Sequence, residues 1–188
     1  MSFCGKVKEE LSRQISTARH CQIAEIAAIL SVCGQVSISA NDHFCVTVHT
    51  ENVSVARKYF TLLEKTFNIE AVIHVRKNAY LKKSNVYKVE VPSHEDTVRI
   101  LQATKFMSPE QEIADDLSVM SRLVIQKECC KRAFLRGTFL AAGSISDPEK
   151  GYHLEIVCST MERAEQIQSI MKEFELDARI VTRKKNQV

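Results

Sequence analysis

Apolar and polar positions follow two periods along the chain, and these periods predict helices separated by pairs of strands. A short charged helix is expected from Lys6 to about Gln14, and apolar residues at helical spacing predict longer helices over Gln22–Cys33 and Val53–Phe67. Strict alternation with β-branched residues over Gln35–Ala40 and Phe44–Thr50 predicts a hairpin. This part of the chain is therefore expected to run helix, helix, strand, strand, helix.

The same patterns predict how the first half ends. Ala71–Arg76 and Val86–Val91 are expected to form the next pair of strands, and Ser93 to begin a helix with an acidic first turn. Pro109 and several acidic residues then interrupt the pattern, which predicts a linker at about 107–118. We therefore expect a first half at about 1–106 and a second half at about 119–188.

The two halves repeat each other. When Gly34 is aligned with Gly143, Cys21 falls on Cys130, and the order and length of the following elements agree as well. Gly34 also suits a position just past the end of a helix. Each half leaves an apolar face that the other can cover, so the repeat predicts an α+β domain with a pseudo-twofold axis.

The first helix of each repeat carries a narrow face of small residues. These residues are Cys21, Ala24 and Ala28 in one helix and Cys130, Ala133 and Gly137 in the other. Helix axes normally lie about 8–10 Å apart, and small side chains permit the shorter distances. For one helix alone, an ordinary alanine-rich surface would explain the pattern. The matched spacing in both favours two helices that pack against each other on the axis.

Composition and charge narrow the class of protein. An apolar fraction of 45% over 188 residues is enough for a core, and the net charge of +3 permits a nucleic-acid partner without requiring one. The seven cysteines form no CxxC pair, which favours reduced thiols in a cytoplasmic protein. We expect neither a signal peptide nor a membrane span.

Part of the second repeat resembles a known motif. The segment Leu135–Gly143 resembles the LAGLIDADG motif of homing endonucleases, and Ile26–Gly34 resembles a more diverged copy. The matching positions are Leu135, Gly137, Ala141 and Gly143. The longer string Phe134–Ile156 is similar to the signature of the WhiA family of bacterial sporulation and cell-division regulators, as are the strings KVKEEL and AEIAAIL.

This resemblance implies a LAGLIDADG homing-endonuclease-like fold with two αββαββ-type halves, antiparallel saddle-shaped sheets and paired axial helices. It also implies a DNA-binding transcriptional regulator, linked to sporulation, cell division and chromosome segregation and associated with the nucleoid. Sequence-specific binding would then belong to a helix-turn-helix domain further along. Because the second half ends after its third predicted strand, we expect this chain to be a fragment of a longer protein.

The resemblance does not extend to the catalytic residues. In the resembling nucleases an acid precedes the final glycine of each axial helix, whereas Cys33 and Ala142 occupy those positions here. Mg²⁺ requires oxygen ligands, which neither residue supplies. The nearest acids, Glu25 and Asp147, have no symmetric partners. We therefore expect no enzyme activity. The alternatives are a metal-dependent endonuclease that uses displaced carboxylates and a scaffold that binds only protein.

No other pattern predicts a metal or cofactor site. The six histidines are scattered without ligand spacing. A zinc site at Cys129 or Cys130 would need partners that the sequence does not display. These adjacent cysteines are expected to be one buried and one half-exposed thiol.

Basic residues gather on equivalent strands of the two halves. They are Arg76, Lys77, Lys82, Lys83 and Lys88 in the first half and Arg179, Arg183, Lys184 and Lys185 in the second. On a saddle that straddles double-stranded DNA, these side chains would neutralise phosphates without reading bases. A solvated sheet face with lysines at its edges is an equally good interpretation. We expect this fragment to bind duplex DNA weakly and without sequence preference. Other regulatory proteins are a second possible class of partner.

Overall fold

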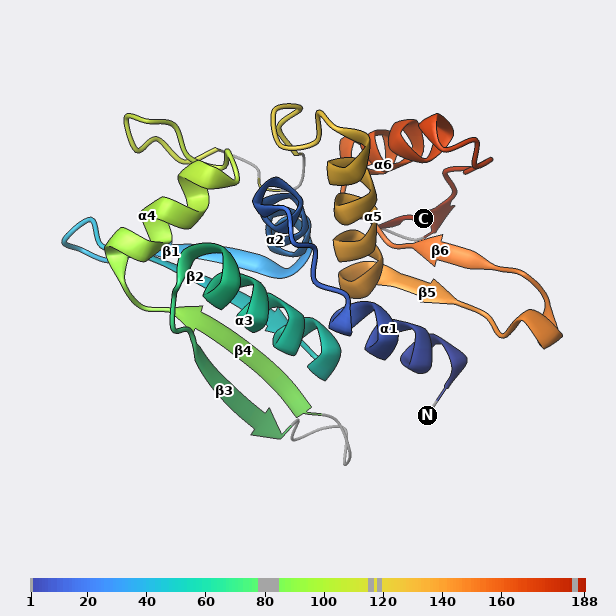
Figure 1. The fold of residues 1–188 in the computed structure, drawn as a ribbon, viewed down its shortest axis with the longest axis horizontal. Coiled ribbons are helices and arrows are strands. Elements are labelled where there is room, and N and C mark those ends of the chain that lie inside the picture. Colours follow the sequence, from blue (N-terminus) through green and yellow to red (C-terminus); the bar gives the residue numbers. More distant parts are fainter. Residues whose placement is uncertain (1, 78–84, 115–116, 118–119, 184–185) are drawn as a thin grey trace.

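Two halves lie side by side around a central pair of helices in the computed structural model (Figure 1). The described residues are 2–77, 85–114, 117, 120–183 and 186–188. The central helices are α2 (Arg19–Cys33) and α5 (Glu128–Ala142), one from each half. This arrangement confirms the predicted α+β, LAGLIDADG-like fold with paired axial helices.

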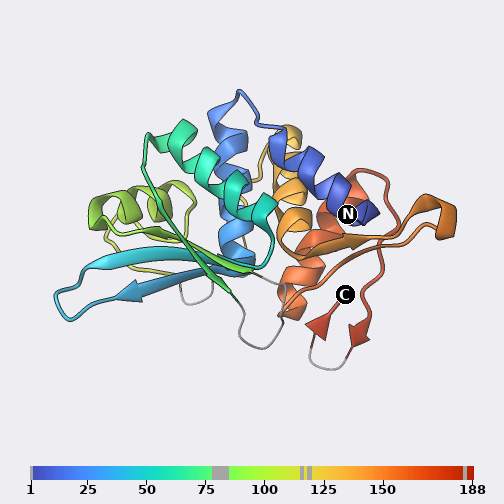
Figure 2. The ribbon, with the colours of Figure 1, turned by 90° about the horizontal axis from the view of Figure 1, so that it is seen from below.

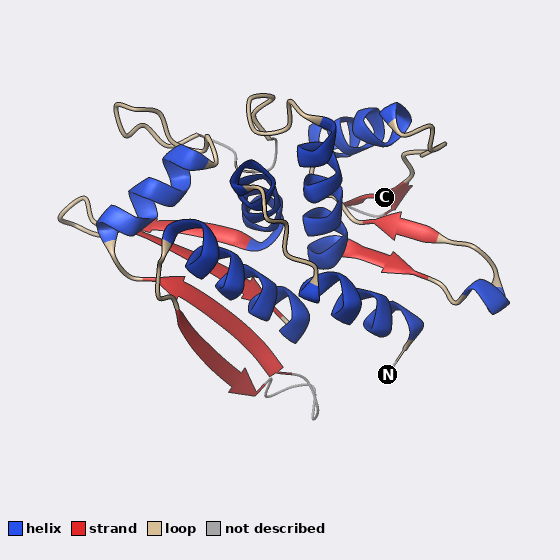
Figure 3. Cartoon of the chain, in the orientation of Figure 1, coloured by secondary structure: helices blue, strands red, loops and turns tan. Residues whose placement is uncertain are grey.

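The first half contains a complete four-stranded antiparallel sheet (Figure 3). Besides α2, its elements are α1 (Phe3–Arg13), β1 (Gly34–Ile38), β2 (Phe44–Thr50), α3 (Val53–Phe67), β3 (Val72–Lys77), β4 (Asn85–Val91) and α4 (His94–Ala103). The strand order is β1-β2-β4-β3. Helices α3 and α4 begin where the sequence predicts, because a polar side chain caps the start of each. Asn52 accepts a hydrogen bond from the Ser54 amide at 2.8 Å, and Ser93 accepts one from the Asp96 amide at 3.2 Å.

The second half repeats this order with shorter strands. After α5 come β5 (Gly143–Ile145), the 3-10 helix η1 (Pro148–Lys150), β6 (Leu154–Ile156), α6 (Met161–Glu173), β7 (Thr182–Arg183) and β8 (Asn186–Gln187). A bridge between Cys158 and Gln187 places β8 beside the chain that follows β6, as β4 lies beside β2. The expectation that this half ends after its third strand was wrong, because β8 is a short fourth strand.

The glycines at the ends of the axial helices are required by crowding. Gly34 has φ −83° and Gly143 has φ −85°, so neither adopts the left-handed conformation that favours glycine at a helix end. A β-carbon at Gly34 would lie 2.9 Å from the Leu30 α-carbon, and one at Gly143 would lie 2.7 Å from the Phe139 carbonyl oxygen. Each glycine therefore lets a strand leave its helix directly.

Helices cover one side of the first sheet and leave the other side open (Figure 2). Val46, Val48, Val89 and Val91 alternate onto the covered side and are fully or almost fully buried. Helix α2 is buried around most of its circumference, as expected for an element between two halves. Among the described residues, no helix is both long and apolar enough to cross a membrane.

Candidate functional site

The axial helices approach each other closely along their middle. Ala24, Ala28, Ala133 and Gly137 are all buried. A β-carbon at Gly137 would lie 2.9 Å from the Ala28 β-carbon and 2.9 Å from the Glu25 carbonyl oxygen. There is no room for a larger residue at this position without a shift of one helix.

A buried charge network ties this contact to the surrounding helices. The Glu25 side chain is fully buried and accepts two hydrogen bonds from Arg136, at 2.9 and 3.1 Å. Lys58 Nζ lies 3.0 Å from the same carboxylate and donates to the carbonyls of Leu11, at 3.2 Å, and Gln14. Burial lowers the pKa of Lys58, and the nearby carboxylate opposes that shift. Glu25 is thus engaged by two cations, which weakens the alternative of a displaced nuclease carboxylate.

The C-terminal ends of the axial helices offer no carboxylate at the motif positions. Cys33 is half-buried, its thiol donates to the Ile29 carbonyl at 3.3 Å, and burial raises its pKa to about 12. Ala142 is half-buried and has no side-chain donor. Asp147 lies beyond β5 and accepts a hydrogen bond from the Glu149 amide at 3.2 Å, as a cap of η1. None of these three residues supplies an oxygen ligand between the helix ends.

On the first sheet, the predicted basic residues divide between its faces. Strand alternation places Arg76 and Lys88 on the open face and Lys77 on the other, and Arg76 and Lys77 are exposed. Lys88 Nζ lies 2.6 Å from Glu90 Oε2, and His74 Nε2 lies 3.4 Å from the same oxygen. The hydrogen bond from Lys88 lowers the pKa of Glu90.

The second half places a similar group on its strands and directly beside them. Arg183 Nη1 and His153 Nε2 each lie 3.1 Å from Glu155 Oε2, and the hydrogen bond from His153 lowers the pKa of Glu155. Arg179 is exposed and lies 3.6 Å from Asp177. The other basic residues predicted to contact DNA lie outside the described residues: Lys82, Lys83, Lys184 and Lys185.

Each half thus combines a carboxylate with a histidine and a basic side chain. Sequence reasoning singled out the basic residues and missed Glu90 and Glu155. The alternation within the strands would have placed Glu90 on the same face as Lys88. The positive charge available to a phosphate backbone is consequently smaller than the number of basic residues implies.

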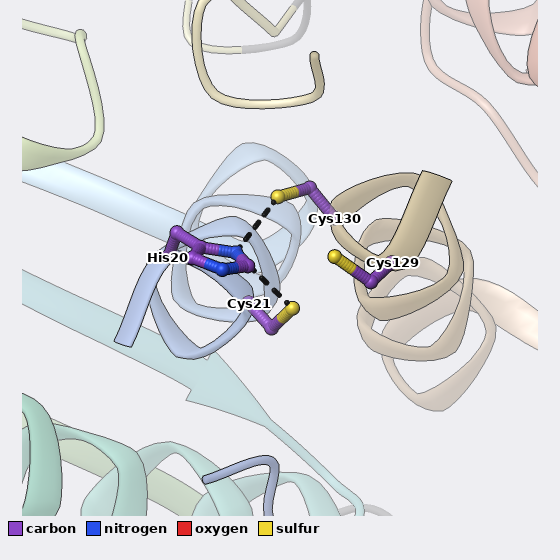
Figure 4. A group of neighbouring side chains, drawn as sticks. All are labelled: His20, Cys21, Cys129 and Cys130. Atoms are coloured by element: carbon purple, nitrogen blue, oxygen red, sulfur yellow. Dashed lines mark hydrogen bonds between the residues drawn. The ribbon is translucent and has the colours of Figure 1, made fainter. Parts of the chain in front are cut away.

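Four potential metal ligands meet at the N-terminal ends of the axial helices (Figure 4). His20 and Cys21 lie in the first turn of α2, and Cys129 and Cys130 lie in the first turn of α5. His20 Nδ1 lies 3.2 Å from Cys130 Sγ and 3.3 Å from Cys21 Sγ. All four ligand atoms lie within 4.8 Å of one another. The partners that the sequence did not display for Cys129 and Cys130 are therefore present in the fold.

These four residues differ in exposure. Cys21 and Cys130 are each 3% exposed, and burial raises the pKa of both thiols, that of Cys21 to about 11. His20 and Cys129, the other two members of the cluster, are exposed to solvent. The sequence predicted one buried and one half-exposed thiol here; Cys130 is buried, and Cys129 is more exposed than predicted. The repeat alignment, which sets Cys21 on Cys130, was the sequence signal for the cluster.

The paired axial helices and the repeated sheets define a LAGLIDADG-like domain. The model of the WhiA N-terminal LAGLIDADG-like domain matches residues 19–107, and that of the WhiA LAGLIDADG-like domain matches residues 131–188. The chain belongs to the WhiA family.

Similar proteins from other bacteria agree with this assignment. The chain is 50% identical over 188 residues to a probable cell division protein WhiA of Lachnoclostridium phytofermentans and 39% identical over 189 residues to one of Desulforamulus reducens. It is matched over 100% and 98% of its own length, and it spans 60% and 56% of theirs. Both matched proteins are thus considerably longer than this chain.

Solved structures show the same fold. Full-length DUF199/WhiA from Thermatoga maritima aligns with a TM-score of 0.71 at 20% identity, covering 100% of this chain and 56% of that one. The homing endonuclease I-WcaI, bound to its DNA recognition sequence, aligns with a TM-score of 0.51 at 17% identity, covering 97% and 78%. At these identities the comparison establishes architecture and not activity.

Proposed function

We propose that this chain is a non-catalytic domain of a DNA-binding transcriptional regulator that acts in sporulation, cell division and chromosome segregation, in the cytoplasm at the nucleoid. The observation that carries the proposal is that Cys33 and Ala142, the residues before the final glycines of the axial helices, have no carboxylate, in a fold shared with a nuclease bound to DNA. Sequence-specific reading would belong to a helix-turn-helix domain outside this chain.

The chemistry of the axial helices favours binding over cleavage. Hydrolysis of a phosphodiester with Mg²⁺ needs oxygen ligands that hold the ion beside the attacking water and the leaving oxygen. Cys33 and Ala142 provide none, and Glu25 is held by Arg136 and Lys58. Purified chain is therefore expected to leave supercoiled plasmid uncut in Mg²⁺ or Mn²⁺.

Binding to the phosphate backbone would come from the open sides of the sheets. Arg76, Lys88 and Arg183 are the described basic residues best placed for it, since long side chains on strands reach phosphates more readily than base edges. Glu90 and Glu155 offset part of this charge. A net charge of +3 adds little long-range attraction, so binding should be weak and strongly dependent on salt.

Fluorescence anisotropy on two unrelated duplexes, at low and at moderate salt, tests the proposal. Arg76→Glu with Lys88→Glu should weaken binding to both duplexes equally. For each phosphate that the double variant no longer neutralises, the slope of log K against log salt should become shallower by about 0.9. Arg57→Glu with Lys65→Glu, which makes the same charge change on α3 away from the open face, is the matched control and should have a smaller effect.

Three outcomes would contradict the proposal. Tight binding to one duplex only would mean that this domain reads bases. An equal loss of binding in the control variant would mean that net charge, and not the open face, is responsible. Undetectable binding at low salt would favour a scaffold that contacts only protein.

A further inference from the structure

The cluster at the N-terminal ends of the axial helices plays no part in DNA binding as proposed above. We propose that His20, Cys21, Cys129 and Cys130 bind a single zinc ion that fastens the two halves of the domain together. Its ligands would be three thiolates and one imidazole nitrogen, a combination that structural zinc sites use.

The spacing of the ligand atoms fits one tetrahedral ion. With Zn–S bonds of about 2.3 Å and a Zn–N bond of about 2.0–2.1 Å, neighbouring ligand atoms should lie about 3.5–3.8 Å apart. The two distances from His20 Nδ1, 3.2 Å to Cys130 and 3.3 Å to Cys21, are within a few tenths of an ångström of that value. The limit of 4.8 Å for the whole group leaves only small side-chain adjustments.

The types of ligand exclude the ions that the nuclease fold uses. Thiolates are soft ligands that select zinc over Mg²⁺ or Ca²⁺, which require oxygen. An iron–sulfur cluster would hold its cysteines on the outside of a larger inorganic core, further apart than this compact group allows. Four protein ligands also leave no open position, so the site is structural and not catalytic.

The surroundings favour the charge of such a complex. Zn²⁺ with three thiolates carries a net charge of −1. The ligands lie in the first turns of α2 and α5, where the positive ends of both helix dipoles stabilise anionic groups. Arg132 and Arg136 line the pocket beside Cys21 and Cys129, although their ion pairs with Glu128 and Glu25 offset much of their positive charge.

The symmetry of the fold explains how the site is assembled. His20 and Cys21 are the second and third residues of α2, and Cys129 and Cys130 are the second and third residues of α5. Each half contributes one adjacent pair at the same position of its axial helix. The ion would therefore lie on the pseudo-twofold axis and bridge the two halves. The axial helices are about 22 Å long, and the degenerate motif positions lie at their other end.

Cobalt and zinc titrations of the fully reduced chain test the site. Co²⁺ should give the visible bands of a tetrahedral ion and the ultraviolet thiolate charge-transfer band, at one ion per chain, and Zn²⁺ should displace it. Zn²⁺ should also raise the unfolding temperature by mass action. His20→Asn and Cys129→Ser are suitable variants because both side chains are exposed and their loss should not prevent folding.

Each of these variants should weaken zinc binding by at least about 100-fold, since loss of a residue that merely supports a metal ligand costs about 10–100-fold. The matched control is Cys45→Ser, which replaces a half-buried cysteine on β2. This variant should bind zinc as the unaltered chain does. The proposal is wrong if the reduced chain takes up no stoichiometric Zn²⁺, if the cobalt spectrum lacks the thiolate band, or if His20→Asn and Cys129→Ser bind zinc normally. Formation of a Cys21–Cys130 disulfide in air, with no zinc uptake after reduction, would also contradict the proposal and would indicate a redox-active cysteine pair instead.

Discussion

The two ends of the axial helix pair differ in their chemistry although the same pseudo-twofold axis builds both. At the C-terminal end, the equivalent positions are Cys33 and Ala142, which offer no pair of hard ligands. At the N-terminal end, Cys21 and Cys130 are equivalent, and His20 and Cys129 lie beside them. One end has no carboxylate at these two positions, and the other brings three thiols and an imidazole together.

This difference shows what an axial helix pair contributes by itself. A twofold axis brings a residue that lies close to it near its counterpart, so a single ligand position on the facing side of each axial helix becomes a pair in the fold. The identity of the side chains then decides whether the pair does chemistry. Glu25, between the two ends, has no acidic counterpart and is neutralised by Arg136 and Lys58, so it supports the packing of the helices.

Among changes to the helix pair, removal of this central carboxylate should reduce the free energy of unfolding most, because Glu25 connects α2 to Arg136 on α5 and to Lys58 on α3. Glu25→Ala would leave the fully buried ammonium of Lys58 without its counter-ion, which costs about 3–5 kcal/mol. Chemical denaturation measures the change in unfolding free energy. Glu128→Ala, which removes an exposed ion pair with Arg132, is the control and should cost less than about 1 kcal/mol. Equal effects of the two substitutions would mean that the buried network does not hold the helices.

Most of the fold could be predicted because strong local signals coincide with the elements. The helix Val53–Phe67 was predicted with its observed bounds, since Asn52 caps its start and the apolar spacing continues to its end. The strands β7 and β8 have two residues each, too few to show a period, and β8 was missed. The reason for a glycine at position 34 could not be predicted either. A sequence does not show whether a glycine is needed for a left-handed backbone conformation or because neighbouring atoms leave no room for a β-carbon.

The candidate sites were harder to predict, because they depend on which residues meet across the fold. The basic residues on the strands were visible in the sequence, but the ion pair of Arg183 with Glu155 joins residues on different strands. The cysteine and histidine cluster joins His20 to Cys130 across 110 positions, so no short ligand spacing reveals it. The internal repeat carried that information, but only as an alignment of one cysteine with another.

A large side chain in the middle of the pair should have the next largest effect. Gly137→Leu would force α2 and α5 apart, because even a β-carbon there lies 2.9 Å from the Glu25 carbonyl oxygen. Overpacking of this kind costs about 1–3 kcal/mol, which exceeds the gain in helix propensity of less than about 1 kcal/mol. Gly137→Ala provides a graded comparison and should cost less. An unfolding midpoint of Gly137→Leu at or above that of the unaltered chain would contradict close packing at this position.

The smallest expected effect comes from restoring acids at the C-terminal end, with Cys33→Asp and Ala142→Asp combined. Two carboxylates that face each other raise each other's pKa above the unfolded value of about 3.9. Groups with a raised folded pKa lose stability as pH rises through that pKa, so the double variant should be less stable relative to the unaltered chain at pH 7 than at pH 4. The part of this loss that exceeds the sum of the two single variants should resemble an exposed ion pair in size, about 0.2–1 kcal/mol, and Mg²⁺ should reverse it at pH 7 by binding the folded form. Thermal unfolding at both pH values, with each single variant as a control, measures the effect. If the two single changes add without extra pH dependence and Mg²⁺ has no effect, the two motif positions do not face each other, and the contrast between the two ends of the helix pair would lose its geometric basis.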